Sequence, residues 1–224
     1  MAVVGVDGCK DGWIAVVNRG GEISANYLER IDELGDVVED AEVIAIDIPI
    51  GLLAEGARRA DMEGRRELAR RQSTLYVVAV RAALEAPSHE EATRISKATS
   101  GFGISRQSFA LKSKIFEVER WLCDAPCPVY EVHPELSFKE MVGSVVDSSK
   151  KSWAGMTVRR RALLREGIDL DRVVGEVGDR AASDDMLDAG AAAWSAGRIL
   201  EGRARCIPST PERSPSGREI AIWV

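Results

Sequence analysis

The sequence is poor in cysteine and histidine and has no long apolar run. Its 224 residues include four cysteines and two histidines, too few for the disulfide framework of a small secreted domain. No run of 18 apolar residues occurs, which excludes a transmembrane helix. The stretch from Met1 to Asp7 has no basic region, so no signal peptide is expected. These absences predict a cytoplasmic protein with no membrane segment.

Common nucleotide- and metal-binding motifs are missing too. The chain has no Gly-x-x-x-x-Gly-Lys-Ser/Thr loop, and the pair Gly101 and Gly103 lacks the third glycine of a dinucleotide-binding fingerprint. Cys123 and Cys127 have no second ligand pair nearby, which argues against a zinc site. Aromatic residues make up 5% of the chain and form no evident platform, which argues against stacking of single-stranded bases.

Charge is unevenly distributed along the chain. Asp and Glu number 36 against 30 Lys and Arg, whereas proteins that wrap duplex DNA are usually basic. Between Arg58 and Lys114 the balance reverses, with 12 basic against 6 acidic residues. This segment predicts either a local binding site for a polyanion or a solvated helix face. A solvated helix face is also expected for Arg159, Arg160 and Arg161, with contact to phosphate as the alternative.

Short apolar runs separated by turns predict a mixed sheet. The first three runs are joined by Gly-rich turns and are typical of an antiparallel meander. The fourth is β-branched and nearly continuous, as in buried parallel strands, and a short fifth run stops at a proline. The five predicted strands cover residues 2–6, 13–17, 23–28, 43–48 and 129–133.

Helical patterns occupy most of the remaining sequence. The segment 53–125 is mostly helical, with Ser88 as the N-cap of one helix. A Gly- and Ala-rich helix is predicted from Ser183 to Gly202, and its small residues allow a close approach to a sheet. We therefore predict one α/β domain over residues 1–224, a sheet flanked by helices, with a helical insertion at about 53–126 between the fourth and fifth strands.

Acidic residues recur where the predicted strands end. Asp7 ends the first strand, Asp47 ends the fourth, and Glu131 lies in the fifth. Asp185 and Asp188 are three residues apart, so they share one face of the last helix. Sites in open α/β sheets form at the carboxyl ends of strands near a switch in strand order. The pattern predicts that these five carboxylates converge, whereas Glu135 is expected only at the start of the next helix.

Converging carboxylates repel one another unless a cation compensates them. Mg²⁺ prefers oxygen ligands, and paired divalent ions can activate water and stabilise the leaving oxygen of a phosphodiester. Helix capping alone explains Asp185 but not Asp188, which lies beyond the first turn. We therefore predict Mg²⁺ or Mn²⁺ bound by Asp7, Asp47, Asp185 and Asp188, with Glu131 as a further catalytic candidate.

Four segments jointly resemble a known family. They run in order from Val4 to Trp13, Asp47 to Leu52, Glu131 to Phe138 and Asp184 to Ala189. They are similar to the predicted-nuclease family called domain of unknown function 429, to which a ribonuclease-H-like fold is assigned. The resemblance implies a five-stranded mixed sheet and a carboxylate-metal site at the first and fourth strands and the last helix. The last pair of acids, Asp185 and Asp188, is similar to that of Holliday junction resolvases.

The chain departs from the family pattern in the basic segment. Ala60 stands where the family tends to have cysteine, which argues against a thiolate role, and Ala79 stands where it tends to have proline. Neighbouring polar residues remain as candidates for contacts with substrate phosphates. The predicted substrate-binding residues are Arg59, Asp61, Arg65, Arg81, Ser105, Gln107 and Lys114.

These observations favour a metal-dependent nuclease, a hydrolase acting on nucleic acid, with DNA and RNA both left open as substrates. One alternative is a non-catalytic nucleic-acid-binding or scaffold module of the same fold. A small-phosphoester hydrolase is another. A phosphotransferase is disfavoured, because related kinases need two such domains and this chain supplies one. A homodimer is left open.

Overall fold

The computed structural model describes residues 1–173 and 176–224. The chain forms two compact units. Unit 1 comprises residues 1–48, 121–205 and 223–224, and unit 2 comprises residues 49–120 and 206–222. The single domain expected from the sequence stays a prediction.

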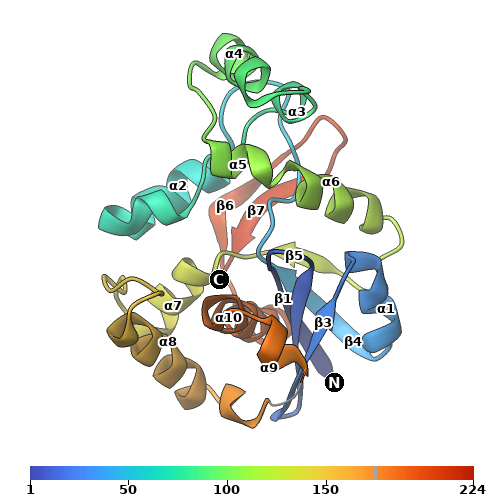
Figure 1. Cartoon of the computed structure of the whole chain (residues 1–224), viewed down its shortest axis with the longest axis vertical. Coiled ribbons are helices and arrows are strands. Elements are labelled where there is room, and N and C mark those ends of the chain that lie inside the picture. The colour runs from blue at the N-terminus through green and yellow to red at the C-terminus, as the bar shows by residue number, and fades with distance from the viewer. Residues whose placement is uncertain (174–175) are drawn as a thin grey trace. The chain divides into compact units, whose positions relative to one another are not determined.

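Unit 1 contains a mixed five-stranded sheet in the order β3-β2-β1-β4-β5 (Figure 1). Strands β1, β2 and β3 are antiparallel, and β4 pairs in parallel with both β1 and β5. The strands are β1 (Ala2–Gly8), β2 (Trp13–Arg19), β3 (Glu22–Leu28), β4 (Ala41–Ile46) and β5 (Val129–Glu131). The ribonuclease-H-like arrangement implied by the resemblance, a meander followed by parallel strands, is confirmed.

Burial explains why these runs form strands. Strand β1 is buried from Ala2 to Asp7 and strand β4 from Val43 to Ile46, and these stretches are apolar except for Asp7, whereas the edge strand β3 is exposed or half-buried up to Leu28. The predicted hairpin between β2 and β3 turns at Gly20 and Gly21, whose φ angles are +63° and +97°. Two successive left-handed residues suit a tight hairpin, and glycine adopts that conformation without steric cost.

Helices of unit 1 cover the sheet. Helix α10 (Ser183–Leu200) packs on one face, with α7 (Pro134–Val142) and α8 (Trp153–Arg165) beyond it (Figure 1). The shorter elements are η1 (Ile31–Glu33), α1 (Leu34–Val37), η3 (Leu170–Arg172) and α9 (Glu176–Arg180). The predicted last helix is confirmed, but its predicted N-cap is wrong: Ala182 occupies that position, and Ser183 is already helical.

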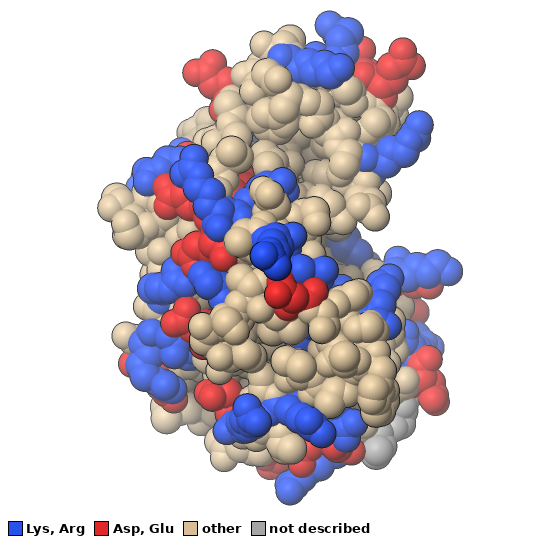
Figure 2. All heavy atoms as spheres, turned by 90° about the vertical axis from the view of Figure 1, so that its left-hand side faces the viewer, with Lys and Arg blue, Asp and Glu red and all other residues tan. Residues whose placement is uncertain are grey.

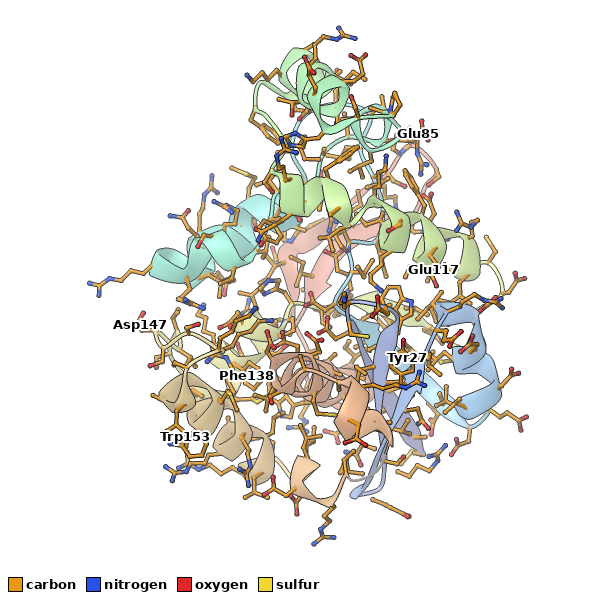
Figure 3. The ribbon with its side chains drawn as sticks, in the orientation of Figure 1. Tyr27, Glu85, Glu117, Phe138, Asp147 and Trp153 are labelled. Atoms are coloured by element: carbon orange, nitrogen blue, oxygen red, sulfur yellow. The ribbon has the colours of Figure 1, made fainter. Side chains whose placement is uncertain are left out.

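Small residues let α10 lie close to the sheet. A Cβ atom on Gly5 would lie 1.9 Å from the Ala193 nitrogen and 2.2 Å from the Ala189 oxygen, so only glycine fits there. On the other side of α10, Phe138 of α7 is fully buried and belongs to the same core (Figure 3). A buried hydrogen bond of 2.8 Å between the hydroxyls of Ser137 and Ser195 also joins α7 to α10.

Unit 2 is mostly helical, as the sequence pattern predicts. The predicted cap is confirmed, since the Ser88 hydroxyl accepts a hydrogen bond from the Glu91 amide. The helices are α2 (Arg59–Leu68), η2 (Ala69–Thr74), α3 (Arg81–Leu84), α4 (His89–Ser100), α5 (Arg106–Ala110) and α6 (Lys112–Trp121). A two-stranded sheet of β6 (Cys206–Arg213) and β7 (Glu219–Trp223) was not predicted. Strand β6 contains Pro208 and Pro211, which a strand without a second neighbour tolerates.

Surface charge is mixed in sign. On the face in Figure 2, blue Lys and Arg side chains stand beside red Asp and Glu side chains. Most arginines in ion pairs, such as Arg19 with Asp40 and Arg94 with Glu91, are surface residues. Within the described ranges, no helix combines the length and apolar character needed to cross a bilayer.

The close contact at Gly5 predicts a large effect of one methyl group. We expect Gly5→Ala to lower the free energy of unfolding by more than about 3 kcal/mol, because the new Cβ would overlap the α10 backbone. Urea denaturation measures the change. Gly197→Ala is the matched control within α10, because no atom lies within 4 Å of its Cβ position. It should be neutral or stabilise by up to about 1 kcal/mol. Equal stability of the Gly5 variant and the wild type would contradict the close packing.

Candidate functional site

Strand register places two aspartates side by side. Gly5 of β1 pairs with Ala45 of β4, and both strands continue in the same direction. Two residues further on, Asp7 and Asp47 therefore lie next to each other on the face that also carries Gly5. The Asp47 amide donates a hydrogen bond of 2.9 Å to the carbonyl oxygen of Val6, which holds the pair in register.

Helix α10 brings further carboxylates to the same face. It crosses β1 at Gly5, and its N-terminal turns continue towards Asp7. Asp188 is 3% exposed and Asp7 is 7% exposed, so both carboxylates are removed from water. Asp185, one turn earlier on α10, is partly buried. The charges of Asp47, Asp188 and Asp185 each raise the pKa of Asp7, so these three carboxyls lie near it. Their role as metal ligands stays a prediction.

A lysine that was not predicted reaches into this cluster. Lys150 lies between α7 and α8, and its ammonium group donates to the Asp188 carboxylate and lies 3.6 Å from that of Asp184. The loop is fastened to α8, because the Ser152 hydroxyl donates to the Ser149 carbonyl at 2.8 Å. The sequence showed only a polar loop here, and no local pattern distinguishes this lysine from its neighbour Lys151.

Burial and like charge raise the pKa values of the clustered carboxyls. Burial raises the pKa of Asp7 well above its ordinary value, and Asp47 and Asp188 raise it further. Burial also raises the pKa values of Asp47 and Asp188 to about 7, although Lys150 partly offsets it in both cases. Burial alone would lower the pKa of Lys150, but Asp188, Asp7 and Asp47 together outweigh it, so the pKa is raised. One ammonium group therefore faces an excess of carboxylates.

Glu131 lies on the other face of the sheet. It pairs with Ile46, and both side chains point away from the face of Asp47 because successive residues in a strand alternate. Its neighbours Tyr130 and Val132 pack with Ala192 and Ala196 of α10 on the site face. The sheet thus separates Glu131 from the aspartates, and its catalytic role stays a prediction without support from this placement.

A buried ion pair supports the site from α7 and α8. Both Nη2 contacts from Arg159 to the Glu135 carboxylate are short, at 2.8 and 2.7 Å, and Arg159 is fully buried. The expectation that Arg159 belongs to a solvated face is wrong, because this residue points inward while Arg160 and Arg161 are exposed. Arg159 Nη1 also donates to the Ser148 carbonyl at 3.0 Å, so the pair fastens the loop that carries Lys150.

The donors suit a divalent cation in their chemistry. Asp7, Asp47 and Asp188 offer carboxylate oxygens, the ligands that Mg²⁺ and Mn²⁺ prefer. The Oδ1 atom of Asp188 is buried and has no hydrogen-bond partner within the described residues, so an acceptor is left open. Among those residues, no three acidic, histidine or cysteine side chains are already gathered as ligands. The Lys150 ammonium is the cation that contacts Asp188 in this arrangement.

The predicted substrate-binding residues all lie in unit 2, where most have partners within the unit. Asp61 is buried, accepts from the Val78 amide at 2.8 Å and lies 3.5 Å from Arg58, which indicates a structural role. Arg65 donates to the Leu75 carbonyl at 2.5 Å. The remaining partners are Glu63 for Arg59, Glu85 and Glu119 for Arg81, the Ser108 amide for Ser105 and Tyr76 for Gln107. Lys114 lies in α6. Contact of these residues with substrate stays a prediction.

The family Protein of unknown function (DUF429) matches residues 5–213. The chain belongs to this family. The four sequence segments, apart from Val4, and the Asp7, Asp47 and α10 carboxylates lie within the matched range. No curated protein is significantly similar in sequence. The RuvC structure of Thermus thermophilus is similar at 11% identity and a TM-score of 0.38, over 91% of this chain and 98% of that one.

The buried pair of Glu135 and Arg159 predicts a cost for breaking it. We expect Arg159→Met to lower the free energy of unfolding by roughly 3–5 kcal/mol, because it leaves the Glu135 carboxylate buried without its cation. Thermal denaturation followed by circular dichroism checks this. Arg160→Met removes an exposed guanidinium from the same helix and should leave the midpoint nearly unchanged. A midpoint for Arg159→Met equal to that of this control would contradict a structural role of the pair.

The raised carboxyl pKa values predict a pH dependence of stability. In the folded chain Asp47 and Asp188 keep protons up to about pH 7, whereas unfolded aspartate releases them near 3.8. The folded state therefore binds more protons in this window, and stability falls as pH rises through it. In EDTA, we expect Asp47→Asn to reduce the loss of stability between about pH 5 and about pH 8, measured by urea denaturation. The exposed Asp36→Asn should show the same dependence of stability on pH as the wild type. The same dependence in the Asp47 variant would refute the raised pKa of Asp47.

Proposed function

We propose that this protein is a divalent-metal-dependent nuclease that hydrolyses phosphodiester bonds. The observation that carries the proposal is the proximity of Asp7, Asp47 and Asp188, from three separate elements, with Asp7 and Asp188 buried and Asp47 half-buried. Burying several carboxylates together is unfavourable, so an arrangement that serves stability alone would not retain it. An acidic cluster at the carboxyl ends of strands that a single ammonium group only partly compensates is suited to binding cations.

Each aspartate has a distinct place in this proposal. Asp7, Asp47 and Asp188 would hold Mg²⁺ or Mn²⁺, and Asp185 would complete the set from the rim. The bound ions would supply an activated water and neutralise charge on the phosphate. Backbone pairing of β1 and β4 fixes Asp7 and Asp47 before the substrate binds, so little entropy is lost in orienting them for the reaction. Lys150, once exchanged from Asp188, would offer its ammonium to a phosphate oxygen of the substrate.

Nucleic acid is the proposed substrate, and DNA and RNA are both retained. Basic residues of unit 2 would contact backbone phosphates, which positions a strand without reading its sequence. Cytoplasmic location and a homodimer stay predictions.

A non-catalytic binding module is a second candidate that one observation favours. Lys150 contacts Asp188, and no ligand trio is gathered within the described residues. If Lys150 permanently replaces a metal ion, the site is structural. Calorimetric titration with Mn²⁺ separates the two: a nuclease should bind the ion in the wild type, whereas a structural lysine should permit binding only in Lys150→Gln.

The nuclease proposal predicts metal-dependent cleavage that requires Asp7. A panel of single- and double-stranded DNA, RNA, a hybrid and a four-way junction is incubated with Mg²⁺ or Mn²⁺ and analysed on denaturing gels. We expect cleavage of at least one member by the wild type and a loss of at least about 100-fold in Asp7→Asn, because one ligand is weakened. The exposed Asp36→Asn should cleave like the wild type. Cleavage retained in the Asp7 variant would reject the mechanism.

A further inference from the structure

Helix α8 carries an exposed apolar face that its packing does not explain. Its inner face is buried through Gly155, Arg159, Ala162 and Leu163. Its outer face holds Trp153, which is 79% exposed, and Leu164, which is 52% exposed. Figure 3 shows Trp153 on the outer side of α8, pointing away from the core. No other aromatic side chain of the described residues is as exposed, so this tryptophan is available to a ligand.

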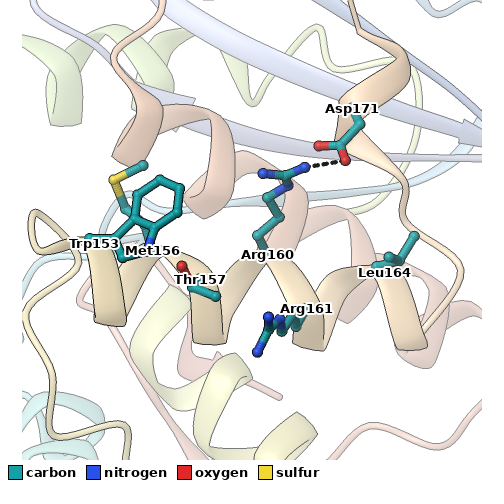
Figure 4. Close-up of a pocket in the computed structure, with 7 residues that line it drawn as sticks. All are labelled: Trp153, Met156, Thr157, Arg160, Arg161, Leu164 and Asp171. Atoms are coloured by element: carbon teal, nitrogen blue, oxygen red, sulfur yellow. Dashed lines mark hydrogen bonds and ion pairs between the residues drawn. The ribbon is translucent and has the colours of Figure 1, made fainter.

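The exposed side chains border a hollow of about 290 Å³. Its lining is largely apolar along α8, and guanidinium groups stand beside it (Figure 4). The residues are Trp153, Met156, Thr157, Arg160, Arg161, Leu164 and Asp171. Arg160 is paired with Asp171, whereas Arg161 has no ion pair or hydrogen bond within the described part of the chain. The hollow thus offers an indole face with one unengaged cation nearby, which suits a flat ring that carries negative charge.

Charge along this segment selects the kind of partner. Residues 150–165 contain six Lys or Arg and no Asp or Glu, in a chain with a net charge of −6. Three of the six, Lys150, Arg159 and Arg160, are paired with acidic residues of other segments. The exposed positive charge of the segment therefore comes from Lys151, Arg161 and Arg165. A second copy of this helix would bring like charges together, which disfavours self-association through this face. A polyanion is complementary to it. An exposed indole stacks with bases only when they are free of a duplex, so a single strand fits better than a double helix.

The same segment leads into the aspartate cluster. Lys150, which contacts Asp188, precedes Trp153 by three residues, so their Cα atoms lie within about 11 Å. The loop between them is held to α8 by Ser152, whose hydroxyl accepts from the Gly155 amide at 3.1 Å and donates to the Ser149 carbonyl. A strand bound at Trp153 would therefore lie close to the loop whose lysine contacts Asp188.

We propose that the outer face of α8 is a binding surface for single-stranded nucleic acid, with a base stacked on Trp153 and a phosphate on Arg161. This inference rests on the proposed nuclease function and names the form of its substrate. It also revises the expectation that the chain has no stacking platform: a single tryptophan among few aromatics is inconspicuous in the sequence, and only its exposure beside arginines makes it a candidate.

Binding without turnover tests the surface directly. The probes are fluorescein-labelled oligothymidylate and oligouridylate of about 20 nucleotides, longer than one typical binding site. Fluorescence anisotropy is measured in EDTA, where cleavage does not occur. We expect Trp153→Ala to weaken binding by about 5- to 100-fold, because stacking on an aromatic ring is lost, and Trp153→Phe to restore most of the affinity. A duplex of the same length should bind more weakly than the single strand and should be insensitive to Trp153→Ala.

The charge contribution has a matched control on the same helix. Arg161→Gln should reduce the slope of log affinity against log salt by about 1, as expected for one lost phosphate contact. Arg165→Gln removes the same charge from the last turn of α8 but does not line the hollow, and it should change affinity by less than about twofold. Equal losses in the two variants would show a diffuse electrostatic effect and would overturn the assigned phosphate contact.

Two outcomes separate this inference from the nuclease proposal. If the wild type binds single strands through Trp153 but cleaves none of the panel, the surface stands and the nuclease proposal fails. If the wild type cleaves but Trp153→Ala binds the single strand as tightly as the wild type, the nuclease proposal stands and the surface is rejected. Failure of the wild type to bind any single strand also rejects the surface.

Discussion

The close approach of α10 to β1 governs the rest of unit 1. Because Gly5 has no side chain, the α10 backbone lies directly against the strand, flanked by Ala189, Ala192 and Ala193. This packing fixes the height and rotation of the helix, and with them the position of Asp188 over the carboxyl ends of the strands. A larger residue at the crossing would lift the helix and separate its carboxylates from Asp7. The same contact therefore builds the core and assembles the site.

The assembled carboxylates create an electrostatic cost that the surrounding structure partly relieves. Lys150 supplies one positive charge to Asp188, while burial keeps the pKa of that carboxyl near 7. The ion pair between Glu135 and Arg159 fastens the loop that carries the lysine. Two layers of side chains thus hold an unfavourable cluster in place. Groups of like charge with raised pKa values are typical of sites at which a bound cation or substrate compensates the charge.

Most of the secondary structure followed from local patterns, and its errors have physical causes. Alternation, β-branched runs and turn glycines located all five strands of the main sheet, since these signals act over a few residues. The small sheet of β6 and β7 was missed because the prolines of β6 suggested irregular chain, although only five residues separate the two strands. Arg159 was misassigned for a similar reason: a run of three arginines looks solvated until the fold buries the one that faces Glu135.

By itself, the sequence determined the strand order along the chain, the family, and Asp7, Asp47 and Asp188 as candidates, because acidic residues at strand ends and beyond a helix cap are locally conspicuous. Only the tertiary structure decided which acids share a face. Register put Asp47 beside Asp7 and turned Glu131 to the opposite side, although both were candidates in the sequence. Tertiary contacts likewise place Lys150, and not Lys151, against Asp188, and they leave Trp153 exposed. Facing and burial depend on residues far apart in the chain, and local sequence does not encode them.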